Sequence, residues 1–364
     1  MRPLIIFGTR PEAIKLAPVI RLMQEDSAWN PIVISSGQHR EMLAQVMSDL
    51  SIQVDRDLSI MRESQTLAYV TGAVINSVHE CLTEFQPDLV MVQGDTTTAF
   101  GAALASFYRN IPVAHVEAGL RSGSLLDPFP EEMNRQVVSK LASWHFAPTP
   151  LSALNLEAEG VDPKAIEVTG NTVIDNLKWV LRQGLGRSAF TSPSQRVLVT
   201  LHRRENQGEH MVQIASALRR ICARGDVEVV LPLHMSPQVR DVLQPALAGV
   251  KGMNLIEPLS YVDFVRTMND ADVILTDSGG VQEEAPSLGK PVLVLRTTTE
   301  RPEGVTAGSA LLVGVDADAI VRQCTRLLDD KAWYRTMSEV QNPYGTGGSA
   351  EQILLRLTNE LTHS

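Results

Sequence analysis

Cysteine is scarce in this chain, and long apolar runs are absent. Only three cysteines occur among 364 residues, and Cys81, Cys222 and Cys324 lie far apart. An odd and scattered set of thiols argues against a disulfide framework and predicts reduced, structural cysteines in a reducing compartment. No stretch approaches the roughly 20 apolar residues of a membrane-spanning helix, and the run Leu4–Phe7 is too short for the apolar region of a signal peptide. We therefore expect a soluble, cytoplasmic chain.

Motifs of several common binding sites are missing as well. The first apolar run is not followed by the Gly-x-Gly-x-x-Gly of dinucleotide-binding proteins, and no Gly-x-x-x-x-Gly-Lys-Ser/Thr loop occurs. The histidines and cysteines form no metal-ligand cluster such as His-Glu-x-x-His. A formal net charge of -10 argues against broad contact with nucleic acid or anionic lipid, but leaves room for a local phosphate pocket. We expect no metal, no cofactor, and no nucleic-acid or membrane partner.

What the chain does contain is an alternation of short apolar runs with segments of helical period. In the segment Gln65–Phe85, for example, Leu67, Val70 and Val74 fall near the i, i+3, i+4 spacing. Runs rich in Val and Ile suit strands buried on both faces of a parallel sheet, and their alternation with helices predicts a doubly wound α/β architecture. The runs are Leu4–Phe7, Ile32–Ile34, Leu89–Val92, Val113–Val116, Val197–Leu201, Val227–Leu231, Val273–Leu275 and Val292–Leu295.

The alternation pauses around Gly170 and in the polar stretch Gln183–Gln195. We therefore predict two Rossmann-like domains, residues 1–170 and residues 171–348, each large enough for its own core. Domains of this kind bind ligands beyond the carboxyl ends of their strands. Functional residues should therefore directly follow the apolar runs.

Two carboxylates in the first half meet this expectation. Asp95 and Glu117 follow successive apolar runs, and unpaired carboxylates at the ends of buried strands are costly unless they are used. Glu131 lies in a Pro-led helix start, where its charge could simply stabilise the helix dipole. Arg10 and Lys15 lie at the start of another predicted helix, and either face an anion or lie on the surface.

The second half offers a histidine and a glycine-rich turn. His202 follows an apolar run and is itself followed by arginines, a pattern that favours acid–base chemistry or anion binding. Another run leads into Ser278-Gly279-Gly280 and a helix start. Glycines let backbone N–H groups approach a phosphate, although a simple tight turn has the same pattern. Glu284, one turn into the helix, could reach ribose hydroxyls.

Taken in order, these segments resemble the motifs of the non-hydrolysing UDP-N-acetylglucosamine 2-epimerases. The likeness runs through nearly the whole chain, and although any one motif is weak, nine in series are highly specific. The nine are Gly8–Lys15, Gly37–His39, Gln93–Thr96, His115–Ser122, Pro130–Arg135, Thr169–Asn171, His202–Glu205, Asp277–Glu284 and Thr299–Glu303.

The resemblance implies an architecture and an assembly. The fold would be glycosyltransferase-B-like, with the active site between two Rossmann-like domains and UDP on the second. A final helix at about residues 349–364, for which Ser349 and Gln352 make a capping-box pattern, would cross back to the first domain. The chain would form a homodimer.

The resemblance also implies roles for residues. Proton transfer and catalysis would fall to Asp95, Glu117, Glu131 and His202. UDP would be bound by Arg10, Ser278, Gly279, Gly280 and Glu284, to which we add Lys15 from its place at the helix start. A regulatory substrate site would contain Gln38, His39, Arg203 and His234. Glu41 and Ser64 depart from the Gln and Arg expected beside them, which leaves substrate activation open.

The chemistry of such a family accounts for this set of residues. Removal of the C2 proton with loss of UDP from C1 gives 2-acetamidoglucal, and re-addition with protonation from the opposite face gives UDP-N-acetylmannosamine. Two faces need two proton-transfer groups, and a departing diphosphate needs cations and N–H donors. Which carboxylate removes the proton and which returns it stays open.

Four alternatives remain at this point. Within the family, the substrate could be a modified sugar nucleotide such as a 2,3-diacetamido uronic acid. A glycosyltransferase of the same fold would transfer the sugar to an acceptor. A hydrolysing 2-epimerase would release free sugar, and a regulator would bind the nucleotide sugar without turnover.

Overall fold

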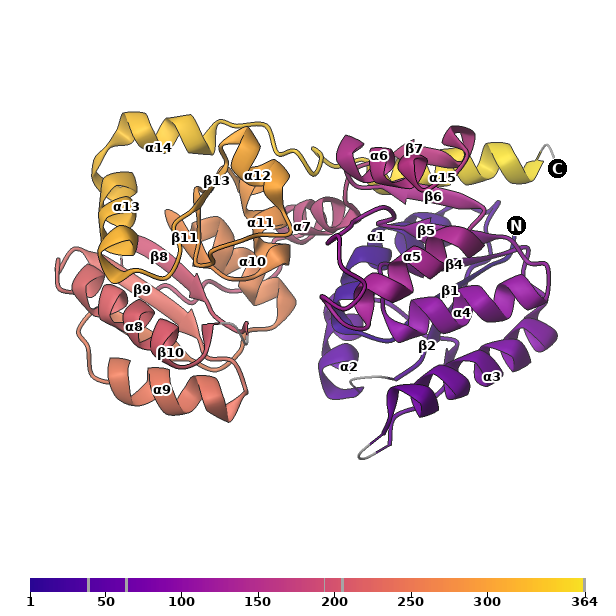
Figure 1. Ribbon diagram of the computed structural model, residues 1–364, viewed down its shortest axis with the longest axis horizontal. Helices are drawn as coiled ribbons and strands as arrows, with labels where there is room; N and C mark the ends of the chain where they lie inside the picture. Colours follow the sequence, from indigo (N-terminus) through magenta and orange to yellow (C-terminus); the bar gives the residue numbers. More distant parts are fainter. Residues whose placement is uncertain (38–39, 63–64, 193, 204–205, 363–364) are drawn as a thin grey trace. The chain divides into compact units, whose positions relative to one another are not determined.

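The computed structural model describes residues 1–37, 40–62, 65–192, 194–203 and 206–362. The chain forms two compact units, of which the first comprises Met1–Asn176 with Gly347–Ser364 and the second Leu177–Thr346 (Figure 1). It passes from the first unit to the second within helix α7 (Thr172–Arg182), shortly after the boundary predicted at Gly170.

The first unit is built on a seven-stranded parallel sheet with the order β3-β2-β1-β4-β5-β6-β7. The chain starts at β1 in the interior, adds β2 and β3 on one side, and then returns to add β4 to β7 on the other. This reversal makes a doubly wound sheet with a switch point between β1 and β4. The strands are β1 (Pro3–Phe7), β2 (Ile32–Ser35), β3 (Arg56–Asp57), β4 (Leu89–Gln93), β5 (Val113–Val116), β6 (Trp144–Ala147) and β7 (Ile166–Val168).

Helices fill the connections between these strands. The predicted helix near residues 65–85 is present as α3, and it buries the apolar stripe that includes Val70, Val74 and Val78 against α4. The helices are α1 (Arg10–Glu25), α2 (Arg40–Asp49), α3 (Leu67–Phe85), α4 (Thr97–Tyr108), α5 (Glu131–Leu141), α6 (Pro150–Ala158), the 3₁₀ turn η1 (Pro163–Ala165) and α15 (Ser349–Thr362).

The last helix, α15, belongs to the first unit although it follows the second in sequence (yellow in Figure 1). It packs against α1, and Arg356 donates a hydrogen bond of 2.6 Å to the carbonyl of Lys164. The predicted capping box is wrong, because the Ser349 hydroxyl has no hydrogen-bond partner among the described residues. Instead, the Asp175 carboxylate accepts from the backbone N–H groups of Gly348, Ser349 and Ala350. A side chain from α7 therefore caps this helix.

The second unit repeats the plan with six parallel strands in the order β10-β9-β8-β11-β12-β13. The strands are β8 (Gln195–Thr200), β9 (Val227–Pro232), β10 (Met253–Ile256), β11 (Val273–Thr276), β12 (Val292–Val294) and β13 (Ala310–Leu312). The helices are α8 (Glu209–Cys222), α9 (Pro237–Leu247), α10 (Tyr261–Asp270), α11 (Gly279–Glu284), the 3₁₀ turn η3 (Ala285–Leu288), α12 (Pro302–Ala307), α13 (Ala317–Asp329) and α14 (Lys331–Ser338). Its switch point lies between β8 and β11.

Each unit buries its own apolar core between sheet and helices. Every residue of β1 and β4 is buried, and so is every residue of β11 in the second unit. All eight predicted apolar runs form strands, which confirms the predicted α/β class. The three cysteines are buried and free. Within the described parts of the chain, no helix has the length and apolar character that crossing a membrane requires.

Candidate functional site

Polar groups gather where the central strands of both sheets end. In the first unit, β1 leads to Arg10, β4 to Asp95 and β5 to Glu117, and β4 and β5 are hydrogen-bonded neighbours. In the second unit, β8 leads to His202 and β11 to Ser278. The predicted candidates therefore follow central strands on either side of each switch point, where open α/β sheets bind ligands.

Glu117 is a buried carboxylate that a cation and two side-chain amides hold in place. It is 8% exposed, and the Lys15 ammonium lies 2.5 Å and 2.7 Å from its two oxygens. The amide of Gln93 also donates to it, and that of Asn171 lies 3.4 Å away. Its φ of +62° is unusual for a residue with a side chain, so the backbone stores strain where the carboxylate is aimed. The structure brings Lys15, predicted to contact phosphate, together with Glu117.

Gln93 and Asn171 were not predicted as site residues. Gln93 is the only amide in the otherwise apolar strand β4, and Asn171 belongs to the Thr169–Asn171 motif. Both signals were present in the sequence. Only the fold shows that both side chains point at the same carboxylate.

Asp95 has a different counter-ion. Nε and Nη2 of Arg135 lie 3.1 Å and 2.5 Å from its Oδ2, and the Asn134 amide fixes the Asp95 carbonyl at 2.9 Å. Arg135 also contacts Glu132, which is fully buried and accepts from the backbone N–H of Ser122. Glu132 is thus a structural carboxylate.

Glu131 and Glu132 open helix α5, as the Pro-led motif predicts, but their surroundings differ. Glu131 is half-buried, whereas Glu132 is committed to Arg135 and Gln136. Of the two, Glu131 is therefore the one whose carboxylate can be offered to a ligand. Its catalytic role remains a prediction.

Two further buried groups shape the first unit's loops. Glu12 accepts from the N–H groups of Gly8 and Thr9 and from the hydroxyls of Thr9 and Thr96. Burial raises the pKa of Glu12 to about 7, against the opposing effect of these hydrogen bonds. His115 lies 2.8 Å from the Gly94 carbonyl through Nε2, and burial lowers its pKa to about 3. A neutral His115 positions the Gly94 turn.

Asp277 is the central acceptor of a hydrogen-bond network around His202 in the second unit. It is 0% exposed and accepts from four groups: the backbone N–H of His202 and of Arg203, the Asn206 amide, and Nδ1 of the His202 ring at 3.0 Å. Burial pushes the pKa of Asp277 upward, but the His202 contacts and the other hydrogen bonds bring it below its ordinary value. The carboxylate is ionised at neutral pH.

The Ser278-Gly279-Gly280 turn is bordered by arginines. A Cβ placed on Gly279 would lie 3.8 Å from the guanidinium groups of Arg203 and Arg301, so the bare backbone leaves room beside two cations. Each cation is held by a carboxylate, Arg203 by Glu300 at 3.6 Å and Arg301 by Glu283. The arrangement combines a glycine-rich helix start with positive charge, which suits a phosphate. Arg301 was not predicted as a site residue.

Glu284 and His234 complete the described candidates of this unit. The Tyr261 hydroxyl contacts Glu284 at 3.1 Å, so the predicted ribose-binding carboxylate is oriented from α10. The ring of His234 lies edge-on to that of His202, with centroids 6.2 Å apart. Burial and the charge of His202 lower the pKa of His234.

The predicted regulatory set is only partly described. Arg203 and His234 lie near the Asp277 network, as given above. Gln38, His39, Ser64 and the side chain of Glu41 fall outside the described part of the chain. No group of three potential metal-ligating His, Cys, Asp or Glu side chains occurs in the ranges that the structure describes.

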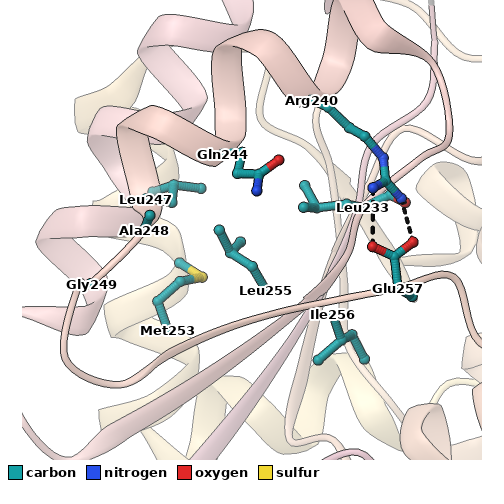
Figure 2. Close-up of a pocket in the computed structure, with 10 residues that line it drawn as sticks. All are labelled: Leu233, Arg240, Gln244, Leu247, Ala248, Gly249, Met253, Leu255, Ile256 and Glu257. Atoms are coloured by element: carbon teal, nitrogen blue, oxygen red, sulfur yellow. Dashed lines mark hydrogen bonds and ion pairs between the residues drawn. The ribbon is translucent and has the colours of Figure 1, made fainter.

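A cavity of about 410 Å³ lies apart from these groups, between α9 and the edge strand β10 (Figure 2). Leucine, isoleucine and methionine side chains line it, and the bidentate Arg240–Glu257 ion pair stands at one side. None of the predicted site residues is among its lining. The candidate chemistry is therefore at the strand ends and not in this cavity.

Comparison with known proteins gives matches along the whole chain. Residues 21–358 match a family model described as UDP-N-acetylglucosamine 2-epimerase. The chain is 49% identical over 371 residues to the UDP-N-acetylglucosamine 2-epimerase of Yersinia pestis, a match that covers 99% of each chain.

Solved structures give the same match. The crystal structure of UDP-GlcNAc 2-epimerase from Neisseria meningitidis bound to UDP-GlcNAc has a TM-score of 0.91 and 45% identity, covering 99% of this chain and 100% of that one. The Methanocaldococcus jannaschii enzyme in complex with UDP-GlcNAc and UDP has a TM-score of 0.83 and 34% identity, with coverage of 99% and 100%. A Rickettsia africae glycosyltransferase, at 15% identity and a TM-score of 0.63, shares the fold alone. The predicted glycosyltransferase-B-like architecture is confirmed.

Proposed function

The chain belongs to the UDP-N-acetylglucosamine 2-epimerase family, and from this premise we propose that it interconverts UDP-N-acetylglucosamine and UDP-N-acetylmannosamine. The observation that carries the proposal is the 49% identity to a relative of that activity over 99% of both chains. The carboxylates with counter-ions in the first unit and the cation-bordered glycine turn in the second supply the groups that this reaction needs.

The proposed mechanism is elimination followed by re-addition. A carboxylate removes the proton from C2 while the bond between C1 and the diphosphate oxygen breaks, and UDP leaves with the bonding electrons. The 2-acetamidoglucal then takes back UDP at C1 and a proton at C2 from the opposite face. Because C2 is inverted by loss and return of a proton, with no hydride transfer in any step, this cycle needs no nicotinamide.

Asp95, Glu117 and Glu131 are the proposed proton-transfer groups. Glu117 and Asp95 are each fixed by a cation, at 2.5 Å from Lys15 and from Arg135. A carboxylate held in one place can approach one face of a sugar ring, so two carboxylates held separately can serve two faces. Lys15 is therefore proposed to hold Glu117 in place, in addition to its predicted contact with phosphate.

The second unit is proposed to hold UDP. The Ser278-Gly279-Gly280 turn and His202 would hydrogen-bond the diphosphate, and Glu284 would meet the ribose. Arg10, in the first unit, remains a predicted phosphate contact. Hydrogen bonds of this type to a departing diphosphate stabilise its developing charge. Cytoplasmic location and a homodimer belong to the same proposal.

The test is incubation of the purified protein with UDP-N-acetylglucosamine in D₂O, without added nucleotide cofactor, followed by proton NMR. We expect a manno H1 signal and loss of the C2 proton signal by deuterium exchange. A control reaction uses Glu117→Gln protein prepared in the same way, which excludes a contaminating epimerase.

The other outcomes separate the alternatives. Free N-acetylmannosamine with UDP would indicate a hydrolysing enzyme. An unchanged spectrum, with extra substrate present as activator, would overturn the proposal in favour of a modified-sugar substrate or a transferase.

A further inference from the structure

His202 has only one side of its ring open to a ligand. Its Nδ1 lies 3.0 Å from Oδ1 of Asp277, while the side chain as a whole is 40% exposed. Nδ1 and Nε2 lie on different edges of an imidazole. The edge that carries Nε2 is therefore the one that is available to react.

Asp277 fixes which nitrogen carries the proton. An ionised carboxylate can only accept hydrogen bonds, so Nδ1 must be the donor in this contact. In the neutral ring Nε2 is then an acceptor, and in the charged ring it is a second donor. The opposite tautomer would place two lone pairs against each other inside the protein.

The carboxylate that imposes this choice is itself immobilised. Three further donors hold it, the N–H groups of His202 and Arg203 and the amide of Asn206, all between 3.0 Å and 3.1 Å. The Asn206 amide also donates to the carbonyl of Leu295, just beyond β12, at 3.0 Å. The network thus joins the ends of β8, β11 and β12, three neighbouring strands of the sheet.

We propose that Asp277 is a positioning residue, which holds His202 in the Nδ1-protonated form so that Nε2 is presented to the diphosphate of the substrate. This rests on the proposed function only for the identity of the group that Nε2 meets. During elimination, Nε2–H of the imidazolium hydrogen-bonds the oxygen that receives the electrons of the C1–O bond. Asp277 stabilises the imidazolium and takes no proton itself.

Other charged groups lie around this pair. His234 approaches from the loop after β9, with its ring centroid 6.2 Å from that of His202, and Arg240 on α9 donates to the His234 carbonyl. Arg203 follows His202 directly and is paired with Glu300. Among the charged groups that the structure describes here, Asp277 is the one that hydrogen-bonds the His202 ring, so its removal should change the protonation of the ring most.

The first experiment needs no turnover. Protein labelled with ¹⁵N-histidine is examined by NMR without ligand over pH 5 to 9, and the His202 signals are assigned with His202→Asn. We expect the ¹⁵N shifts of the neutral ring to show protonated Nδ1 and unprotonated Nε2. A neutral ring protonated on Nε2 would overturn the proposal, even if the protein proves to be an epimerase.

The second experiment compares Asp277→Asn with Asp318→Asn, an exposed aspartate of the same unit paired with Arg220. We expect Asp277→Asn to lose the Nδ1-protonated signature and to lower kcat roughly 10- to 100-fold. Because the imidazolium loses its counter-ion, the alkaline limb of the pH–rate profile should also shift to lower pH. Asp318→Asn should match the wild type. A folded Asp277→Asn protein with an unchanged alkaline limb and an unchanged His202 tautomer would refute the role. Should this variant not fold, the ligand-free spectrum of the wild type decides alone. If the wild type did not epimerise its substrate, the proposed function would be wrong, but the tautomer of His202 would not be affected by that result.

Discussion

Glu12 and Asp277 are buried carboxyl groups, one in each unit, and each lies beside the switch point of its sheet. Glu12 follows β1 and reaches Thr96 beyond β4, whereas Asp277 follows β11 and reaches back to His202 beyond β8. β1 and β4 flank one switch point, and β8 and β11 flank the other. Each carboxyl group therefore links the two loops that border a switch point.

The two groups differ in charge because their donors differ. All the hydrogen bonds to Glu12 described above come from neutral N–H and hydroxyl groups, and burial raises its pKa to about 7. Burial acts on Asp277 too, but one of its donors is an imidazole that can carry a charge, and its pKa falls below the ordinary value. A carboxyl group that links the loops of a switch point thus titrates near neutral pH in one unit, and is a charged, histidine-positioning group in the other.

The proposed reacting groups show a related reversal. In the first unit, carboxylates are held by cations, as Glu117 is by Lys15. In the second unit, cations are held by carboxylates, as Arg203 is by Glu300. Substitution of the proposed proton-transfer carboxylates in the first unit should therefore change kcat, and substitution of Ser278 in the second unit should change UDP affinity.

The largest expected effect is that of Glu117→Gln. A carboxamide cannot transfer a proton, so kcat should fall about 10³-fold while the Kd for UDP stays unchanged. Turnover by NMR and calorimetric titration with UDP measure the two quantities. Glu84→Gln, which breaks the surface ion pair with Arg56, is the matched control and should leave both at wild-type values. A normal kcat in Glu117→Gln, or a much weaker affinity for UDP, would contradict the assignment of proton transfer to the first unit and UDP binding to the second.

Glu12→Gln should remove a pH dependence from the folding of the first unit. Below its ordinary pKa of 4.5 the group is neutral in both states, whereas between 4.5 and about 7 only the folded protein keeps the proton. The free energy of unfolding of the wild type should therefore decrease, by about 3 kcal/mol in all, as pH rises through this window. Urea titrations of wild type and variant at several pH values between 4.5 and 8 give the free energy of unfolding as a function of pH. If this free energy changed with pH equally in both proteins, Glu12 would be charged in the folded protein, as Asp277 is.

Ser278→Trp tests the second unit alone. The Ser278 hydroxyl lies 3.9 Å from where a Cβ on Gly280 would stand, so an indole at position 278 would fill space beside the glycine turn. UDP should therefore bind at least about 100-fold more weakly, equivalent to about 2.7 kcal/mol. Calorimetry measures the affinity, and circular dichroism confirms that the variant is folded. Ser278→Ala keeps the space open and should lose little. An unchanged affinity for UDP in the tryptophan variant would show that the phosphates bind elsewhere than at this turn.

Asp175→Ala has the smallest expected effect. It removes the carboxylate of α7 that caps the start of α15. Three backbone N–H groups at the start of α15 would lose their acceptor, which should destabilise the helix by about 1–2 kcal/mol. Hydrogen exchange of α15 amides measures the loss, with Glu351→Gln in the same turn as the control. Equal protection in both variants would show that packing on α1 alone holds the helix.

Sequence patterns predicted the strands that are buried on both faces. The strands that were not predicted are β3, β6, β7, β10 and β13, and four of these are the outer strands of their sheets. An outer strand such as β10, which is only half-buried, needs no continuous apolar run and therefore resembles a loop in the sequence. The capping box at Ser349 failed for a related reason, since the cap comes from a distant helix.

The candidate site shows the same limit. Residues that follow apolar runs, such as Asp95, Glu117 and His202, could be found because their positions relative to a strand are local. Their partners could not, because Glu117 meets Lys15, Gln93 and Asn171 through the order of strands in the sheet. Contacts across the sheet depend on which strands become neighbours, and a single sequence does not state that order.

The placement of α15 in the first unit has a consequence for how the chain is made. During synthesis the ribosome completes residues 177–346, the whole of the second unit, before it reaches the helix that packs on α1. The first unit must therefore wait with the α1 surface uncovered and with the Asp175 carboxylate lacking the N–H groups that it later binds. The second unit is continuous in sequence and is available to fold first, although it is encoded second.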